Sequence, residues 1–360
     1  MRVTSSDRLI LSCARTFLGT ATPEDAAAIA AGTSAAREVE ARAEALGLGG
    51  VVSTVAPGIV RPLHHRVFRH NACALATADE VGTELARRGV RAVALKGLAL
   101  LFTVYRARLG VRPLSDIDLL VEPHQRAAAE AALGSLGFRS YGFFHRRGEV
   151  DVDLHVDLLG ADLFPTRRLA SRFDPERLWG QVERTASGVA GLLLLSPEHQ
   201  LLHQAVHAMR HSYRRWIWLV DLALLLPRVD PDRLASAAAL TGTTAPLGYA
   251  LHLVDALLRV EAPGRLGERL RQIGRMEAWF LSAMMGGGNV RCGEALGVLS
   301  VDGVRDRVAY LREVCFPGKV VLRRYYPRVP DASLRRHRFG VLLLRLSALC
   351  RPALAMLARR

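Results

Sequence analysis

The spacing of apolar and polar positions along the chain divides it into three stretches. Residues 1–62 are Ala-rich and repeat their apolar positions with a helical period, which predicts N-terminal helices. Residues 63–190 combine one long helical pattern with short apolar runs that alternate with polar residues, as strands do. Residues 191–360 return to Leu- and Ala-rich helical patterns and end in a basic tail. The expected fold class is therefore α+β, with a small α/β unit between helical regions.

Strand signals in the middle stretch follow one another closely. Glycine or proline separates short runs in which apolar and polar residues alternate. Together these runs predict a compact α/β unit. The expected order is a strand at 91–97 ending in a glycine turn, a short helix at 98–109, a strand at 112–121, a helix at 124–136, and paired strands at 138–145 and 149–158.

Helix starts are marked outside this unit as well. Pro23, followed by two acids, fits the first turn of a helix. Ser196 followed by Pro197 fits an N-cap and a first helical position. The run at residues 286–289 (Gly-Gly-Gly-Asn) predicts a loop, because it lacks the Gly-Lys-Ser/Thr ending of a phosphate-binding P-loop.

The composition is strongly basic and otherwise that of a folded globular protein. The chain has 49 Lys and Arg against 34 Asp and Glu, a formal net charge of +15, which favours polyanionic partners. Lys96 and Lys319 are the only lysines, and this skew toward arginine is typical of a GC-rich genome. The charge therefore carries little weight about partners, whereas a lone lysine inside the strand region draws attention.

The cysteines and the apolar runs indicate a cytoplasmic protein. The five cysteines are scattered without Cys-x-x-Cys spacing, which fits a reduced compartment. The apolar run at residues 340–358 is broken by Arg345 and Arg351, and no uncharged run approaches 18 residues. We expect no membrane span.

Two acids in the strand at 112–121 are the first candidate for chemistry. Asp116 and Asp118 stand two apart, so a strand directs both carboxylates to the same side, while Ile117 and Leu119 pack inward. Like charges aimed at one spot repel, and a hard cation such as Mg²⁺ commonly balances them. A solvated edge strand with two acids facing water is the alternative.

Two further segments strengthen the metal interpretation. Lys96 and Gly97 stand at a strand end, where glycine allows backbone amides to approach a phosphate. Asp151, Asp153 and His155 alternate along the last strand and share one face. Acid pairs on neighbouring strands would supply carboxylates to two metal ions, as phosphoryl transfer requires.

This arrangement resembles the nucleotidyltransferases of the DNA polymerase β superfamily and, more narrowly, a bacterial family of uncharacterised nucleotidyltransferases. The narrower family shows a Leu-Lys-Gly turn, then a Tyr and an Arg before Ser-Asp-Ile-Asp, and a strand that ends in Asp-Leu-His. The first turn departs from the wider superfamily, because Gly97 lies 19 positions before Asp116. The residues that carry the likeness are Leu95 to Gly97, Tyr105, Arg112, Ser115 to Val121, Asp153 to His155, Ser196 to His199, His203, His207 and Asp221.

The resemblance implies a polymerase β-like nucleotidyltransferase α/β domain with a mixed sheet, and a role for each matching residue. Asp116 and Asp118 would bind two Mg²⁺ ions, with Mn²⁺ as the alternative metal. Asp153 would be the third carboxylate and help to activate the acceptor hydroxyl, with Asp151 as the alternative. The remaining implied roles are phosphate contacts for Lys96, Gly97 and Arg112, a capping or orienting role beside the nucleotide for Ser115, and support of Asp153 by His155. The alternatives are surface charge near a turn for Lys96 and Arg112, and a packed strand histidine for His155.

Four histidines recur every four residues on one predicted helix. Each step drifts about 40° around a 3.6-residue helix, so neighbours touch but the four do not converge. A structural role, a phosphate or base contact and a metal site stay open, with His203 and His207 as the candidates for ligand contact. The set is His199, His203, His207 and His211.

The leading hypothesis is an enzyme that moves an NMP group from an NTP, with ATP as the expected donor, to an acceptor hydroxyl. The acceptor would be a small molecule, a peptide or protein, or RNA, and the last includes toxin-like modification of tRNA. The rivals are a nucleotide- or RNA-binding protein without catalysis and a metal-dependent phosphohydrolase that uses the histidines. The basic C-terminal region is either a solvated face, which the many arginines of this chain favour, or the place where nucleic acid would bind. Its residues are Arg323, Arg324, Tyr325, Tyr326, Arg335, Arg336 and Arg338.

Overall fold

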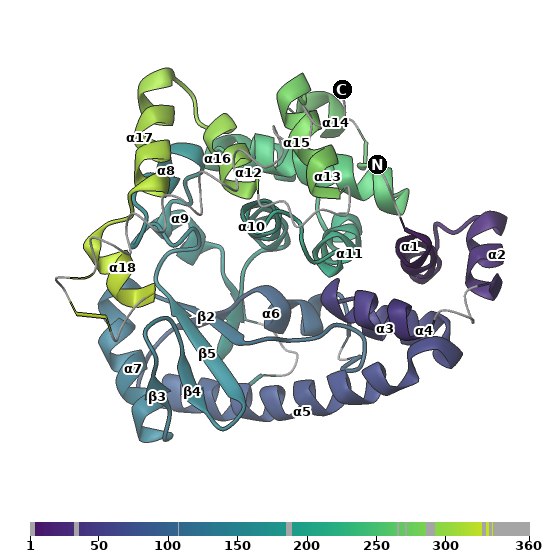
Figure 1. Ribbon diagram of the computed structural model, residues 1–360. Helices are drawn as coiled ribbons and strands as arrows, with labels where there is room; N and C mark the ends of the chain where they lie inside the picture. The colour runs from purple at the N-terminus through teal and green to yellow at the C-terminus, as the bar shows by residue number, and fades with distance from the viewer. Residues whose placement is uncertain are drawn as a thin grey trace.

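The computed structural model describes most of the chain and places a mixed sheet among helices (Figure 1). The described residues are 4–31, 36–106, 108–184, 189–264, 266–270, 272–285, 292–325, 329–330 and 333. The predicted loop at 286–289 lies outside them, as does most of the predicted basic C-terminal region. None of the described helices has both the length and the apolar character that crossing a membrane would need.

A seven-stranded sheet forms the centre of the fold, in the order β3-β4-β5-β2-β1-β7-β6. β2 runs parallel to β5 and antiparallel to β1, and β1 runs parallel to β7, so the predicted mixed sheet is confirmed. The strands are β1 (Ala92–Ala94), β2 (Ile117–Val121), β3 (Arg139–Ser140), β4 (His145–Arg147), β5 (Val150–His155), β6 (Glu183–Arg184) and β7 (Leu192–Leu194).

Helices enclose the sheet and make up most of the described chain. Those before and within the sheet region are α1 (Ser5–Leu18), α2 (Pro23–Ala31), α3 (Ala36–Ala45), α4 (Gly49–Val55), α5 (Pro57–Arg87), α6 (Lys96–Thr103), α7 (Arg126–Ser135), α8 (Arg167–Ala170) and α9 (Pro175–Gly180). Those that follow are α10 (Pro197–Arg210), α11 (Ile217–Leu225), α12 (Pro231–Thr241), α13 (Thr244–Leu258), α14 (Leu266–Arg269), α15 (Arg275–Met285), α16 (Gly293–Leu299), α17 (Val304–Cys315) and α18 (Lys319–Tyr325).

The local signals explain where several elements begin and end. Pro23 and Pro197 open α2 and α10, and the Ser196 hydroxyl accepts a hydrogen bond from the His199 amide, as expected of an N-cap. Gly137, with φ +83°, ends α7 in a left-handed conformation that suits glycine. The single strand predicted at 138–145 is instead two short strands, β3 and β4, separated by a turn.

The two faces of the sheet pack against different layers. α5 and α7 lie along one face, and α10, α11 and α13 lie on the other side of the molecule (Figure 1). In β2, Ile117 and Leu119 join the main hydrophobic core, as predicted, while Leu120 joins a smaller cluster with Val93 and Leu95. Because strand side chains alternate, Asp118 shares the face of Leu120 and points away from α5.

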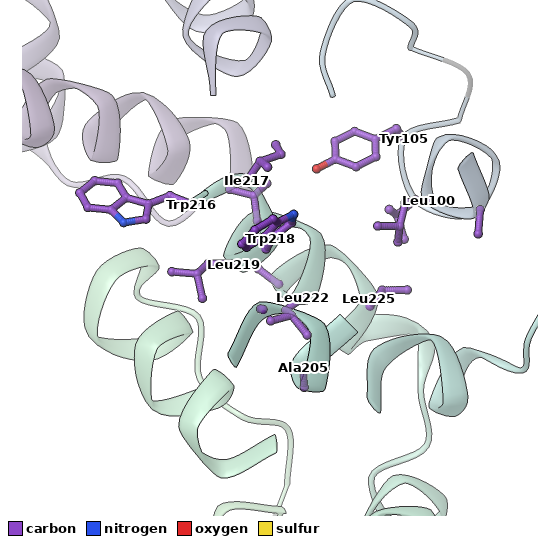
Figure 2. Packing of buried hydrophobic residues seen from close by; sticks show 14 of the residues in the cluster. Leu100, Tyr105, Ala205, Trp216, Ile217, Trp218, Leu219, Leu222 and Leu225 are labelled. Atoms are coloured by element: carbon purple, nitrogen blue, oxygen red, sulfur yellow. The ribbon is translucent and has the colours of Figure 1, made fainter. Parts of the chain in front are cut away.

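Helix α11 lies at the centre of the helical part. Its side chains pack in one core with Ala205 of α10 and Leu100 of α6 (Figure 2). The tract that contains Trp216 and Trp218 is therefore part of the core. Figure 2 also shows the phenol oxygen of Tyr105 turned toward α11.

The N-terminal helices pack against both neighbouring regions. α1 contacts α11 and α13, and α4 packs along α5. The predicted domain boundary at residue 62 falls inside α5, which starts at Pro57, and the boundary at 190 falls just before the sheet strand β7. Those boundaries stay predictions.

Candidate active site

Strand register brings two predicted carboxylates together. β2 and β5 are parallel, and Asp118 of β2 stands directly opposite Asp153 of β5. Asp118 is buried, with 3% of its side chain exposed, whereas 27% of the Asp153 side chain is exposed. The pair therefore presents one carboxylate inside the protein and one at its surface.

Two nitrogen groups meet on a single oxygen of Asp118. The Lys96 ammonium donates to Asp118 Oδ1 at 2.6 Å, and His155 Nε2 lies 2.8 Å from the same oxygen. Burial alone raises the pKa of Asp118, but the Lys96 charge and the His155 hydrogen bond outweigh it and hold that pKa well below its usual range. Asp118 is therefore a carboxylate that stays ionised although it is buried.

Asp116 stands just before β2 and belongs to the same electrostatic group. The Ser115 hydroxyl donates to Asp116 Oδ1 at 2.6 Å, which fits the capping or orienting role expected for Ser115. The negative charge of Asp118, followed by burial, raises the pKa of Asp116. Repulsion between these acids is the situation that a bound cation relieves.

Asp151 has a different partner from the other acids. Its two carboxylate oxygens each accept a hydrogen bond from Arg146, both at 2.6 Å. The ligand atoms of Asp118, Asp153 and His155, in contrast, all lie within 4.8 Å of one another. In the part of the chain that the structure describes, the geometry favours Asp153 over Asp151 as the carboxylate beside Asp118.

The charge of Arg112 has a buried carboxylate partner outside the Asp116, Asp118 and Asp153 group. Its guanidinium pairs with Asp221 of α11, with Nη2 donating to Asp221 Oδ2 at 2.9 Å, and only 7% of the Arg112 side chain is exposed. The Tyr105 hydroxyl and the Gln204 amide also donate to Asp221. This arrangement supports a structural role for Arg112 in place of the predicted phosphate contact.

Gly97 is required by the same packing. A Cβ atom at this position would lie 2.1 Å from Nη1 of Arg112 and 2.6 Å from a methyl carbon of Leu114. The glycine therefore leaves room for Arg112, a reason that differs from the predicted approach of backbone amides to a phosphate.

A cleft of about 330 Å³ opens beside Asp153, His155 and Lys96. Its other walls come from α10 and from the segment that follows β5. The lining residues are Lys96, Phe143, Asp153, Leu154, His155, Leu158, Gly160, Asp162, Leu163, Phe164, Arg167, His203, Val206, His207, Arg210 and His211.

The four histidines of α10 divide as the helical drift predicts. His199 contacts the capping residue Ser196 and lies outside the cleft lining, whereas the other three line it. Burial, and then the Lys96 charge, lower the pKa of His203 to about 3. His207 packs against Trp218 with ring centroids 4.9 Å apart. Because its pKa is about 3, the imidazole of His203 is neutral at pH 7.

Sequence reasoning missed several side chains of the cleft. Among them, Phe143, Arg167 and Arg210 line it but belong to no motif. An arginine carries almost no signal in a chain this rich in arginine. The closest hint was the histidine pattern, because Arg210, the last residue of α10, stands one position before His211.

Two solved structures are similar to this chain. One is the antibiotic-resistance factor ANT(2'')-Ia, with 17% sequence identity, a TM-score of 0.36, and coverage of 47% of this chain and 91% of that chain. The other is a tRNA-processing enzyme, with 13% identity, a TM-score of 0.22, and coverage of 76% and 89%. No curated protein matches the sequence.

The family model described as "Uncharacterised nucleotidyltransferase" matches residues 23–259, about two thirds of the chain. This range includes the sheet, the acids, Lys96, and the histidine-bearing helix α10. The chain therefore belongs to this nucleotidyltransferase family.

Proposed function

We propose that this nucleotidyltransferase moves an NMP group from an NTP, with ATP as the expected donor, to an acceptor hydroxyl and releases pyrophosphate. The observation that carries the proposal is the placement of Asp118 opposite Asp153, with Lys96 and His155 on the same carboxylate oxygen. A protein that only bound nucleotides would gain nothing from acids clustered where a polyanion approaches.

The donor set fits a hard cation. Mg²⁺ takes oxygen ligands at about 2.0–2.1 Å, and the ligand atoms of Asp118, Asp153 and His155 lie within 4.8 Å of one another. Asp118 and Asp153, with Asp116, would hold Mg²⁺ ions, and the imidazole of His155 makes Mn²⁺ the alternative. When bound, the metal would neutralise charge on the transferred and leaving phosphates.

The protein's own groups have distinct tasks in this proposal. The acceptor oxygen forms a bond to the α-phosphorus while the bond from that phosphorus to pyrophosphate breaks, and the hydroxyl proton passes to Asp153. Asp153 suits this task because its carboxylate borders the cleft and is partly exposed. Lys96 fixes the orientation of Asp118 and brings positive charge to the place where negative charge develops.

Label transfer from α-³²P-labelled NTPs tests the proposal. Each NTP is incubated with Mg²⁺, a cell extract and either the wild type, Asp118→Asn or Asp153→Asn. We expect label to move to an acceptor with the wild type and to fall about 10²- to 10⁴-fold in both variants. EDTA should abolish the transfer, and added Mg²⁺ should restore it.

Asp151→Asn is the matched control, because Asp151 lies on the same face of β5 but pairs with Arg146. It should keep most of the transfer activity. Bound NTP without any label transfer would support the binding-protein hypothesis, and release of inorganic phosphate alone would support a hydrolase. Full activity in both Asp118→Asn and Asp153→Asn would refute the proposed site.

A further inference from the structure

Two arginines on the cleft wall share one backbone acceptor. Nη1 of Arg210 donates to the carbonyl oxygen of Leu159 at 2.6 Å, and Nη1 of Arg167 donates to the same oxygen at 3.0 Å. The carbonyl therefore fixes two guanidinium groups side by side. Since like charges held together repel, this arrangement is favourable only where negative charge compensates it.

The two arginines differ in their partners among the described residues. Arg167 has a carboxylate neighbour in Glu294, with an N–O distance of 3.8 Å. Arg210 forms no ion pair within the described part of the chain, and its Nε is buried there without a hydrogen-bond partner. A buried donor without a partner is unfavourable unless a ligand or water satisfies it.

The surroundings fit a small ligand with both polar and charged groups. The Arg167 guanidinium lies over the Phe164 ring, 4.0 Å from its centroid, which fixes the orientation of the guanidinium. The neutral imidazole of His203 offers a hydrogen bond without adding charge. A volume of about 330 Å³ is at the lower end of small-molecule sites.

The position of the cleft indicates which substrate it receives. It is lined by Asp153, the residue proposed to take the acceptor proton, and by Lys96, whereas Ser115 and Asp116 are not among its lining residues. The arginine pair therefore borders the same cleft as the carboxylate that would receive the acceptor proton.

We propose that Arg167 and Arg210 bind a phosphate group of the acceptor, so that the acceptor is a small phosphorylated compound with a free hydroxyl. Guanidinium groups bind phosphate oxygens with paired, charge-assisted hydrogen bonds. The identification of the ligand as the acceptor rests on the proposed transfer reaction, but the phosphate site itself does not depend on catalysis.

Calorimetric titration of the full chain, without NTP or metal, tests the site. The probes are glycerol 3-phosphate, glycerol and ATP, and the variants are Arg210→Gln, Arg167→Gln and Arg210→Lys. Arg233→Gln, an exposed arginine on α12, removes the same charge far from the cleft lining and is the matched control. We expect glycerol 3-phosphate to bind and glycerol not to bind. The two glutamine variants should weaken glycerol 3-phosphate at least tenfold, and the control should change it less than twofold.

Arg210→Lys keeps the charge but removes the planar fork, so it should weaken binding by a smaller factor than Arg210→Gln. Thermal unfolding of each variant checks that it is folded. If Arg210→Gln does not fold, then Arg167→Gln and Arg210→Lys decide the outcome.

Three results would overturn the inference. The first is a tenfold loss of ATP binding in the glutamine variants with unchanged binding of glycerol 3-phosphate, which would assign the arginines to the triphosphate of the NTP. The second is an equal loss in Arg233→Gln, which would show only an effect of net charge. The third is a labelled acceptor without phosphate, or an RNA, in the transfer assay. Absence of any label transfer, in contrast, would refute the proposed function and leave the phosphate site standing.

Discussion

At the scale of single residues, Lys96 is the most constrained side chain of the site. Its backbone has φ +47°, a left-handed conformation that costs a residue other than glycine about 1–2 kcal/mol. Its ammonium lies 2.6 Å from the buried Asp118 carboxylate. Strained backbone that persists in a folded protein is often found at functional sites. The strain and the ion pair together indicate that a positive charge is needed at this position.

Replacement of Lys96 by methionine should destabilise the protein even without substrate. The variant keeps a side chain of similar length but leaves Asp118 buried with only His155 as a partner. We expect the free energy of unfolding at pH 7 to fall by about 2–3 kcal/mol, because the buried Asp118 carboxylate loses a charge-assisted hydrogen bond. Urea denaturation measures the change.

Lys319→Met, at the other, exposed lysine, is the control, and its free energy of unfolding should stay within about 0.5 kcal/mol of the wild-type value. An unchanged Lys96→Met would mean that the ammonium does not hold Asp118.

At the scale of elements, the buried Asp221 network joins the sheet region to the helices. Asp221 on α11 accepts hydrogen bonds from Arg112 before β2, Tyr105 after α6 and Gln204 on α10. Asp221 is fully buried, and the Arg112 side chain is 7% exposed. The network therefore fixes how α10, with its histidines, faces the strands that carry the acids.

The network predicts a graded loss of stability. Asp221→Asn leaves the Arg112 charge buried without its carboxylate and should lower the free energy of unfolding by about 3–5 kcal/mol. Tyr105→Phe removes one hydrogen bond to a charged group and should cost about 1.5–3 kcal/mol. Urea denaturation of both variants ranks the two effects. A Tyr105→Phe variant as unstable as Asp221→Asn would contradict the assignment of the ion pair as the main contribution.

The strand chemistry could be predicted from sequence because it is local. A period of two places Asp151, Asp153 and His155 on one face of β5, and the same alternation buries Ile117 and Leu119. The helical drift of the α10 histidines is equally local. The α/β unit with helical flanks followed from the order of these patterns, whereas the mixed sheet was implied by the family resemblance.

The partner of a charged residue is not local, which explains what the sequence could not provide. Arg112 pairs with Asp221, 109 positions further along the chain, so no spacing rule assigns its guanidinium. Arg167 and Arg210 meet only through the carbonyl of Leu159, a backbone atom that every residue has. Such contacts depend on how α10 and the segment after β5 pack, and that is decided by the whole core.

At the scale of the whole molecule, the N-terminal helices are tied to the far end of the family region. Asp25 of α2 pairs with Arg15 of α1 at 2.9 Å and with Arg259 at the end of α13 at 2.6 Å. The Ser12 hydroxyl and the Thr22 amide donate to the same carboxylate. Asp25 and Arg259 stand near the two ends of the range that the family model matches, so this cluster joins the beginning of that range to its end.

Asp25→Asn should therefore loosen the attachment of α1 and α2 to α13 in a pH-dependent way. Burial raises the pKa of Asp25, but hydrogen bonds from Thr22, Ser12 and Arg15 outweigh it and leave that pKa below its usual range. A carboxylate whose folded pKa is lowered stabilises the protein above its unfolded pKa of about 4, and this contribution disappears as the pH falls through the folded value.

We expect the free energy of unfolding of Asp25→Asn to be about 2–3 kcal/mol lower than that of the wild type at pH 7, and this difference to shrink below about pH 4. Urea denaturation across this pH range measures it, with the exposed neighbour variant Glu24→Gln as the control for lost charge. A difference that stays constant down to pH 2 would show that the ionised carboxylate does not hold the cluster together.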